Sequence, residues 1–178
     1  AITGESNAVE KYNRYAEVAI QEGYPNIAYL FRALVVAETI HIKNHRNALN
    51  LPHQVQYDDF QPKSTLENVQ DAISGETGEH KQMYPRLRKG IKKYRKDKDV
   101  KVVDLSLEWA GEVELTHAQI LKLALQALSS GKDFAVQKLY VCRVCGNLRM
   151  QQSEEICPVC GHDAKFYQEI SKTQENTI

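Results

Sequence analysis

The nine residues AISGETGEH, at positions 72–80, decide the fold that this sequence encodes. They place Glu76, Glu79 and His80 within about two turns of a helix, among apolar residues spaced as in a protein core. The chain opens on nearly the same pattern, because AITGE at 1–5 matches AISGE at 72–76. Glu5 and Glu76 therefore occupy equivalent positions of two helices. A carboxylate that occurs twice in a predicted interior needs a chemical partner there.

Four helices are predicted around this repeat, and they cover residues 1–22, 25–50, 64–94 and 102–129. Gly23 is a typical residue after a helix end, and Pro25 suits the first turn of the next helix. Ser64 and Glu67 form the S-x-x-E pattern of a capping box, which predicts the start of the third helix. The polar segment 51–63 contains two prolines and no periodicity, so it is interpreted as a crossover loop.

Each predicted helix has a stripe of core residues at spacings of three and four, and each stripe includes a glutamate. In the second helix the stripe is Ile27, Phe31, Leu34, Glu38, His41 and His45; in the third, Val69, Ile73, Glu76, His80, Met83 and Leu87; in the fourth, Leu107, Ala110, Glu114, His117, Leu121, Ala124 and Leu128. Such stripes form the seam of a four-helix bundle. For any single glutamate, an error of phase or a surface position is the alternative, but four in phase favour an acidic cluster in the interior.

The acidic cluster needs cations, because no lysine or arginine lies on these stripes to neutralise buried carboxylates. Glutamate and histidine recur three residues apart in two of the helices, so each pair lies on one helix face. One glutamate from each of two helices, with Glu-x-x-His from the other two, is the general pattern of di-iron and di-manganese bundles. Mixed carboxylate and imidazole ligands suit iron or manganese. The predicted ligands are Glu5, Glu38, His41, Glu76, Glu114 and His117.

Glu79 breaks the symmetry of the repeat, since the equivalent position of the first helix is Ala8. Two Fe(II) ions carry four positive charges, which four glutamates balance, and oxidation to Fe(III) adds two more. The hypothesis is that Glu79 replaces neutral His41 as a ligand of one iron upon oxidation. The alternative is an exposed Glu79, because helices expose far more glutamate than they bury. Identical ligands in crystal structures of the reduced and oxidised protein would contradict the hypothesis.

A second metal site is predicted from the four cysteines of the chain, which have the spacing C-x2-C-x11-C-x2-C. These residues are Cys142, Cys145, Cys157 and Cys160. Disulfides are the alternative, but this spacing is typical of a tetrathiolate site in a reducing compartment. Such a site holds iron or zinc: iron would add a one-electron relay, whereas zinc would only stabilise a small domain. We therefore predict a bundle domain at 1–133 and a tetrathiolate domain at 134–178.

Composition excludes several classes of partner. Basic and acidic residues both number 23 in the 178 residues, which gives no electrostatic reason to expect nucleic acid or an anionic membrane. The longest apolar stretch, at 26–42, contains Arg32, Glu38 and His41, so a buried helix is expected there and not a membrane span. No secretory leader is recognised, and a cytoplasmic location is expected.

The two halves together resemble the rubrerythrin family, which joins a ferritin-like di-iron bundle to a C-terminal rubredoxin-like domain. The segments GES (4–6), ETIH (38–41), GETGE (75–79) and ELTH (114–117) match the ligand motifs of the family in order. EKY and QMYP place Tyr12 and Tyr84 where the family has tyrosines near the metals, although plain core packing is the alternative for both. The implied fold is mainly α, a four-helix ferritin-like bundle followed by a small β-rich domain.

The resemblance implies a non-haem peroxidase that reduces hydrogen peroxide to water in defence against oxidative stress. It implies iron at both sites, with zinc possible at the cysteines, and an external electron donor such as a reductase or a rubredoxin. His41, Glu79, Tyr12 and Tyr84 would be the catalytic residues. The family often forms a head-to-tail homodimer in which the rubredoxin-like iron of one subunit lies close to the di-iron site of the other.

Two alternatives come from other functional classes: a ferritin-like ferroxidase, iron-handling or dioxygen-reducing protein, and a metal-stabilised interaction protein. Storage needs no built-in electron relay, and an interaction protein has no use for five in-phase glutamates. The chain departs from the family pattern at Asn147, where rubredoxin-like domains commonly have an aromatic residue, and at His45, which is interpreted as a residue behind the ligands or a merely polar one.

Overall fold

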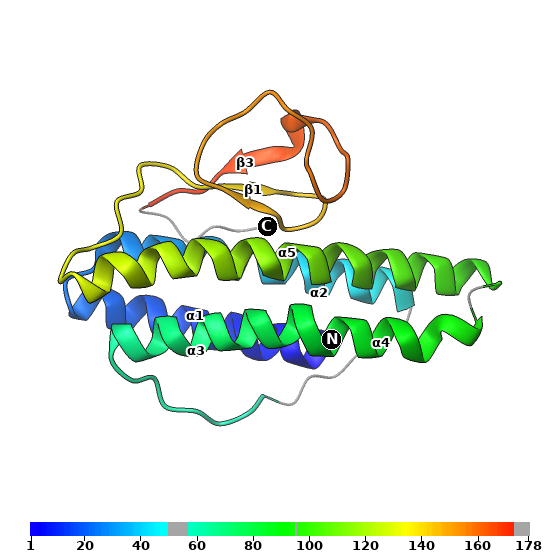
Figure 1. Ribbon diagram of the computed structural model, residues 1–178, viewed down its shortest axis with the longest axis horizontal. Helices are drawn as coiled ribbons and strands as arrows, with labels where there is room; N and C mark the ends of the chain where they lie inside the picture. Colours follow the sequence, from blue (N-terminus) through cyan, green and yellow to red (C-terminus); the bar gives the residue numbers. More distant parts are fainter. Residues whose placement is uncertain (50–56, 95, 173–178) are drawn as a thin grey trace.

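The computed structural model describes residues 1–49, 57–94 and 96–172, which form a long helical bundle with a small β domain on one side (Figure 1). The helical elements are α1 (Ile2–Gln21), α2 (Pro25–Leu49), α3 (Thr65–Gly78), the π-helical segment η1 (Glu79–Met83), α4 (Tyr84–Ile91), the 3-10 segment η2 (Lys92–Tyr94) and α5 (Lys98–Ser129). The segments from α3 to η2 follow one another without interruption, so they serve as the third helix of the bundle. The predicted fold class is confirmed.

Local capping explains where the helices begin. The capping box is confirmed, because Ser64 accepts from the backbone N–H of Glu67 and the Glu67 carboxylate accepts from the backbone N–H of Ser64. The predicted start of the last helix at residue 102 is wrong. Asp97 caps α5 by accepting from the N–H of Asp99 at 2.9 Å, so the helix starts at Lys98.

The core stripes predicted for the second and fourth helices are confirmed, since all their residues are buried in α2 and α5. The stripe of the third helix is only partly correct. Ile73, His80, Met83 and Leu87 are half-buried, and Tyr84 is the buried residue beyond Glu76. The π-helical turn of η1 explains the shift, because its i→i+5 hydrogen bonds change the angular phase of the residues after it.

The β domain is a three-stranded antiparallel sheet in the order β2-β1-β3, formed by β1 (Tyr140–Cys142), β2 (Leu148–Arg149) and β3 (Tyr167–Glu169). Val141 pairs with Leu148 on one side and with Gln168 on the other. A short 3-10 helix, η3 (Ala164–Phe166), precedes β3.

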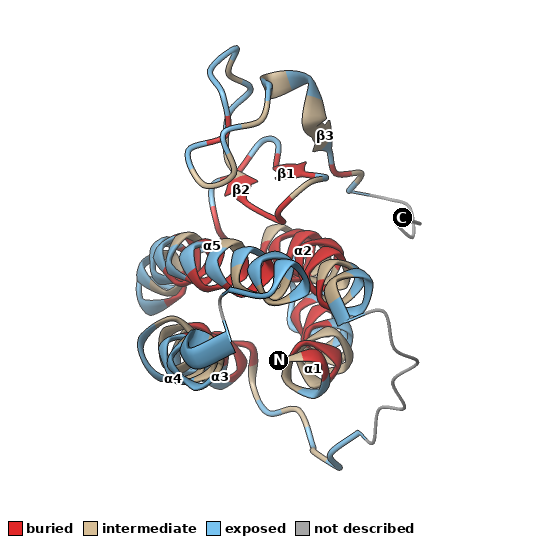
Figure 2. Ribbon diagram, turned by 90° about the vertical axis from the view of Figure 1, so that its right-hand side faces the viewer, coloured by how far each residue is buried: buried red, intermediate tan, exposed pale blue. Residues whose placement is uncertain are grey.

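The β domain packs on the face formed by α2 and α5, as the red buried segments in Figure 2 show. Val141, Leu148 and Ile170 belong to the same buried cluster as the residues of α2. The hydroxyl of Tyr29 connects the two parts, because it donates to the carbonyl of Ile170 and accepts from the N–H of Leu139, both at 2.8 Å. The boundary between the two predicted domains, at residues 133 and 134, stays a prediction.

The segment after α5 also fixes the start of α2. The carboxylate of Asp133 accepts hydrogen bonds from the N–H groups of Asn26 and Ile27, at 2.8 and 3.2 Å. This is a helix cap supplied from more than a hundred residues away, and it ties the beginning of α2 to the end of α5. Among the described residues, no helix has the length and apolar character that a membrane span requires.

Candidate functional site

The six predicted ligands of the carboxylate site meet at the centre of the bundle, and all are buried. They form two overlapping groups in which one ligand atom per residue lies within 4.8 Å of the others. One group is Glu5, Glu38, His41 and Glu114, and the second is Glu38, Glu76, Glu114 and His117. Glu38 and Glu114 belong to both groups. The two groups together would hold a pair of cations.

Unpartnered polar atoms test whether a pair of cations fits this cluster. The six residues hold eight buried ligand atoms without a hydrogen-bond partner: Oε2 of Glu5, both oxygens of Glu38, Nδ1 of His41, Oε2 of Glu76, both oxygens of Glu114 and Nδ1 of His117. Leaving buried polar groups unpaired is costly, and more so for charged ones. The free lone pairs are those that a dinuclear site uses, so the residues fit two iron ions.

Hydrogen bonds on the far side of both histidine rings orient them for metal binding. Nε2 of His41 lies 3.0 Å from the carbonyl oxygen of Cys145, and Nε2 of His117 lies 3.3 Å from that of Gly146. A carbonyl only accepts, so Nε2 carries the proton and Nδ1 is left as a lone-pair donor. Nδ1 of His41 lies 2.8 Å from Glu38, yet it is not aligned for a hydrogen bond. Both Nδ1 atoms therefore belong to the metal-binding cluster.

The electrostatics of the cluster also favour the binding of positive charge. Burial and the charge of Glu114 raise the pKa of Glu5 well above its ordinary value. Burial and the charge of Glu38 raise the pKa of Glu76 to about 8. Burial by itself lowers the pKa of His41, but the charges of Glu114 and Glu38 outweigh it and raise that pKa. Without cations the cluster takes up protons instead.

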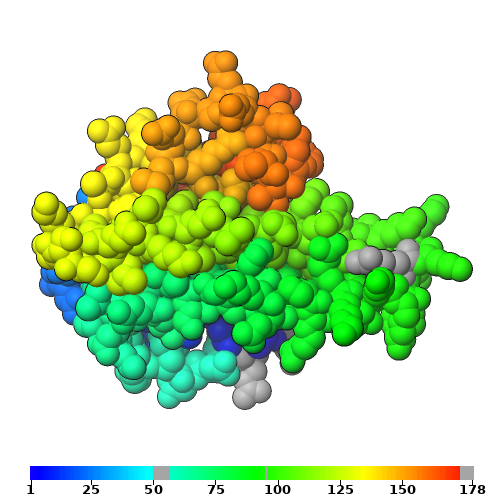
Figure 3. All heavy atoms as spheres, in the orientation of Figure 1, coloured from blue at the N-terminus to red at the C-terminus, as the bar shows by residue number. Residues whose placement is uncertain are grey.

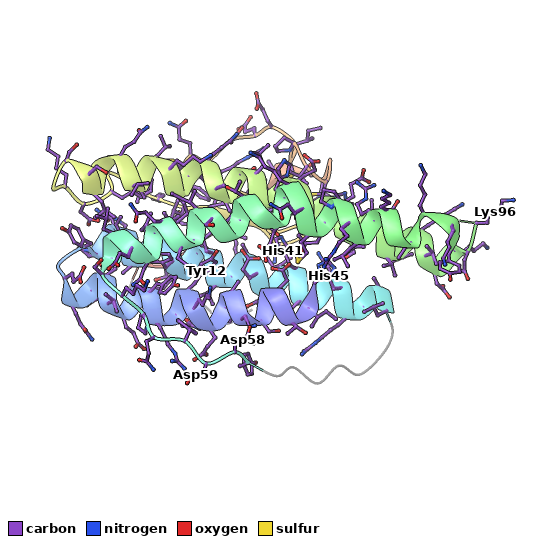
Figure 4. All side chains as sticks on the ribbon, turned by 60° about the horizontal axis from the view of Figure 1, so that its bottom comes forward. Tyr12, His41, His45, Asp58, Asp59 and Lys96 are labelled. Carbon is purple, nitrogen blue, oxygen red and sulfur yellow. The ribbon has the colours of Figure 1, made fainter. Side chains whose placement is uncertain are left out.

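Two tyrosines donate hydrogen bonds to Glu5 and Glu76, the glutamates that each belong to only one of the two ligand groups. The hydroxyl of Tyr12 donates to Oε1 of Glu76, and the hydroxyl of Tyr84 donates to Oε1 of Glu5. In both carboxylates the other oxygen, Oε2, is unpartnered. The tyrosines thus contact two predicted ligands, as the resemblance implies, and Figure 4 shows Tyr12 beside His41 between the helices. Their catalytic role stays a prediction.

Glu79 does not belong to either ligand group. It is half-buried, and burial together with the charge of Glu5 raises its pKa well above the ordinary value. With Tyr12 it lines a cavity of about 90 Å³ between α1 and α3. The small residues Ala8 and Gly75 also line this cavity, and the ion pair of Lys11 with Asp71, at 3.0 Å, lies on its exposed side.

The four cysteines converge in the β domain and are free. Sγ of Cys142 lies 3.8 Å from Sγ of Cys160, and Sγ of Cys145 lies 3.6 Å from Sγ of Cys157. A tetrahedral metal with bonds of about 2.3 Å separates its sulfur ligands by about 3.8 Å. The residues therefore fit a single tetrahedral ion, and the disulfide alternative is wrong. This geometry suits iron and zinc alike.

The turn formed by the first two cysteines and the glycine after them contacts the carboxylate site of the same chain. Gly146 has φ of +87°, and a Cβ atom at this position would lie 2.7 Å from Nε2 of His41. Asn44 of α2 adds a hydrogen bond of 2.8 Å to the carbonyl of Val144. On the α5 side, Val113 packs with three of the cysteines. The resemblance implies that the rubredoxin-like site of one subunit lies close to the di-iron site of another subunit. Here the cysteine site and the carboxylate site of one chain are in contact through the carbonyls of Cys145 and Gly146.

Several residues of the site could not be found from sequence patterns. Tyr167 donates to Sγ of Cys157 at 3.3 Å, and Asn147 donates to the hydroxyl of Tyr167 at 2.7 Å. Asn147 was a visible departure from the family pattern, but its partner was not predictable. His45 is buried and contacts Tyr84, and this contact had no signal beyond the place of His45 on the stripe of α2.

Comparisons with known proteins agree with this geometry. The sequence model of the rubrerythrin family matches residues 1–125. Rubrerythrin-2 of Clostridium acetobutylicum is 35% identical over 168 residues, which cover 90% of this chain and 88% of that protein. Nigerythrin of Nitratidesulfovibrio vulgaris is 29% identical over 90% of this chain and 78% of its own length. Among solved structures, mixed-valence nigerythrin superposes with a TM-score of 0.81 at 26% identity, over 94% of this chain and 82% of that one.

Proposed function

The chain belongs to the rubrerythrin family of di-iron proteins with a rubredoxin-like site, and from this premise we propose that it is a peroxidase that reduces hydrogen peroxide to water. One observation carries the proposal: two ligand groups that share two carboxylates are joined to a tetrathiolate site by two histidine–carbonyl hydrogen bonds. A two-electron site is thus coupled to a site that passes electrons singly.

The reaction is H2O2 + 2H⁺ + 2e⁻ → 2H2O. Iron held by the glutamates and histidines of the carboxylate site would supply two electrons to the peroxide, and iron held by the four cysteines would supply single electrons in return. The protein provides the path for that return. From Cys145 the path runs through its carbonyl to the ring of His41, and a parallel path runs from the carbonyl of Gly146 to His117.

The cavity between α1 and α3 supports access by a small oxidant. Its volume of about 90 Å³ is large enough to admit a molecule as small as hydrogen peroxide. Tyr12 lines the cavity and donates to Glu76, which places a hydroxyl proton between the cavity and a ligand. The ring of Phe31 stacks on the ring of Tyr12, with 5.7 Å between the ring centroids, and adds apolar packing on the core side.

Glu79 is proposed as the fifth carboxylate of the oxidised site, in exchange for His41. Its place outside both ligand groups and beside the cavity suits a residue that enters the cluster only when positive charge increases. The raised pKa of Glu79 means that it holds a proton until a cation attracts it. Crystal structures of both redox states test this exchange.

The remaining expectations form part of the same proposal. The electron donor is an external reductase or rubredoxin, the chain forms a homodimer or a higher oligomer, and it works in the cytoplasm in defence against peroxide. Contact of both metal sites within one chain supports an electron path that does not require a second subunit.

The test uses iron-loaded protein, fully reduced without oxygen and mixed with stoichiometric peroxide, while the visible thiolate-to-Fe(III) band is followed. We expect the band to return rapidly with peroxide and slowly with air. The matched control is the protein with zinc at the four cysteines. In this protein each carboxylate site should reduce one molecule of peroxide and then stop, and no band should appear.

Other outcomes would overturn the proposal. A faster return of the band with air than with peroxide indicates an oxidase. Growth of a mineral beyond a few irons per chain indicates iron handling. Absence of the band in oxidised protein that was supplied with iron indicates zinc at the cysteines and removes the relay.

A further inference from the structure

His45 is a buried histidine that the proposed mechanism does not use. It lies on α2 one turn beyond His41, and its side chain is 3% exposed. Both ring nitrogens have partners: Nδ1 lies 2.8 Å from the hydroxyl of Ser106, and Nε2 lies 3.1 Å from the hydroxyl of Tyr84. Figure 4 shows His45 beside His41, in the space between the helices.

Ser106, His45, Tyr84 and Glu5 are joined by a series of three hydrogen bonds, and the direction of each bond follows from the next one in the series. In the metal-loaded site Glu5 is a carboxylate and only accepts, so the hydroxyl of Tyr84 donates to it. The oxygen of Tyr84 then accepts from Nε2–H of His45. Burial lowers the pKa of His45 to about 3, so the ring is neutral and has only one N–H. Nδ1 is therefore an acceptor, and the hydroxyl of Ser106 donates to it.

This series of hydrogen bonds, in which each group donates to the next, connects the four helices of the bundle. Ser106 lies on α5, His45 on α2, Tyr84 at the start of α4 and Glu5 on α1. All four residues are buried, so water does not compete for their hydrogen bonds. The chain ends on Oε1 of Glu5 and leaves Oε2 without a partner. It thereby determines which oxygen of Glu5 is offered to a cation.

The other half of the site lacks this support. Within the described part of the chain, the hydroxyl of Tyr12 has its hydrogen bond to Glu76, and the ring packs on Tyr15 and Phe31, with no imidazole behind it. The two tyrosine–glutamate pairs are otherwise equivalent by the internal repeat. Any effect of His45 is therefore confined to the ligand group that contains Glu5.

We infer that His45 is a positioning residue of the carboxylate metal site, which acts through Tyr84 to fix the binding oxygen of Glu5. Ser106 contributes by fixing the tautomer of His45. This inference rests on the proposed function only in that the site holds metal, and it is independent of the reaction that the metal performs. Residues behind metal ligands of this kind typically change metal affinity about 10–100-fold.

The first experiment titrates Co²⁺ into protein whose cysteine site is already filled with zinc, and it follows the two carboxylate sites by visible absorption. We expect His45→Leu to weaken one of the two Co²⁺ sites about tenfold and to leave the other unchanged. His45→Gln should restore affinity, because its amide oxygen accepts from Ser106 and its N–H donates to Tyr84. Thr39→Val is the matched control, since it removes a hydroxyl that donates to the carbonyl of Val35 on the same helix.

The second experiment is done with diamagnetic Zn²⁺ in both metal sites, so that Glu5 is a carboxylate. Side-chain ¹⁵N NMR of the histidines should show His45 with its proton on Nε2, and the spectrum of His45→Gln assigns the signal. Ser106→Ala should produce a mixture of both tautomers, whereas Ser106→Thr should keep the single one. This measurement also covers the case in which His45→Leu does not fold.

Three results would overturn the inference: a wild-type His45 with its proton on Nδ1, equal weakening of both Co²⁺ sites in His45→Leu, or equal affinities for the Leu and Gln variants. A protein with both expected results but no reaction with peroxide would keep this inference and remove the proposed function.

Discussion

A single glycine, Gly146, lies between the two metal centres. Its backbone has φ of +87°, which residues with a side chain rarely adopt, and its carbonyl accepts from His117. A Cβ atom here would lie 2.7 Å from Nε2 of His41 and 3.1 Å from the carbonyl oxygen of Ala37. Two independent constraints therefore apply at this position, one from the turn and one from the contact with α2.

Gly161 allows these two constraints to be separated. It follows the second cysteine pair with φ of +70°, but a Cβ there would meet nothing within 4 Å. We expect Gly161→Ala to cost about 1 kcal/mol of stability from backbone strain alone. Gly146→Ala should in addition push the loop away from His41 and slow the return of electrons from the cysteine site by roughly tenfold or more, because a small displacement of coupled groups has large kinetic effects.

The measurement is stopped-flow absorption of the thiolate-to-Fe(III) band after peroxide addition, with the temperature of unfolding as a second reading. Equal rates for the two alanine variants would mean that the contact at Gly146 does not carry the electrons.

At the scale of the elements, the third helix changes its winding where it reaches the site. The π-helical segment η1 starts at Glu79, which lines the cavity, and ends before Tyr84, which contacts Glu5. A regular α-helix would not keep both residues on the site, because the extra residue in the π turn rotates the remainder of the helix about its axis. Beyond the turn, α4 packs closely on α5 at Gly111.

Gly111 is required for the close packing of α4 on α5. A Cβ atom at this position would lie 2.9 Å from Cβ of Tyr84, where neither atom belongs to a flexible side-chain end. We expect Gly111→Ala to lower the free energy of unfolding by about 1–3 kcal/mol. Gly90→Ala on α4 is the control: its Cβ meets nothing, so it should raise stability by about 0.5–1 kcal/mol through helix propensity.

Thermal unfolding of the metal-loaded variants measures both effects, at about 2–4 °C per kcal/mol for a chain of this size. The close contact of α4 and α5 would be irrelevant to stability if Gly111→Ala were as stable as Gly90→Ala.

The whole molecule is a bundle whose centre carries negative charge and whose β domain closes the face formed by α2 and α5. The space-filling view of Figure 3 shows the β domain lying directly on the bundle. Four buried glutamates are tolerated only because cations or protons neutralise them. The stability of the entire fold should therefore depend on the occupancy of the site.

We predict that protein with an empty carboxylate site becomes less stable as the pH rises. Glu76 has a pKa of about 8 in the folded chain and an ordinary value of 4.5, so the folded state binds the extra proton. Its contribution is complete below pH 4.5 and is lost as the pH approaches 8. His41 and His117 have the same sign, because their pKa values are also raised in the folded state, above an ordinary value of 6.5.

The temperature of unfolding should thus fall by several degrees between about pH 6 and pH 9 when only the cysteine site is filled. With iron or Co²⁺ in the carboxylate site the fall should disappear, because the cations replace the protons. A temperature of unfolding that rises over this range without metal would contradict the prediction.

Spacing along the chain was sufficient to predict the bundle, the convergence of the carboxylates and the tetrathiolate cluster. Helical periodicity is a local property, so Glu38 and His41 share a face whatever surrounds them. The capping box at Ser64 is local for the same reason. The cysteine spacing is similarly informative, because two short turns bring four sulfurs to one ion.

Contacts between distant segments required the tertiary structure. The bonds of His41 and His117 to the Cys145–Gly146 loop, and the chain from Ser106 through His45 to Glu5, join residues that are 29 to 104 positions apart. Such pairs depend on how the β domain docks and how a π turn rotates Tyr84, and neither is a periodic feature. Local spacing therefore predicted the ligands, whereas packing decided what orients them, because orientation depends on neighbours that only the folded chain brings together.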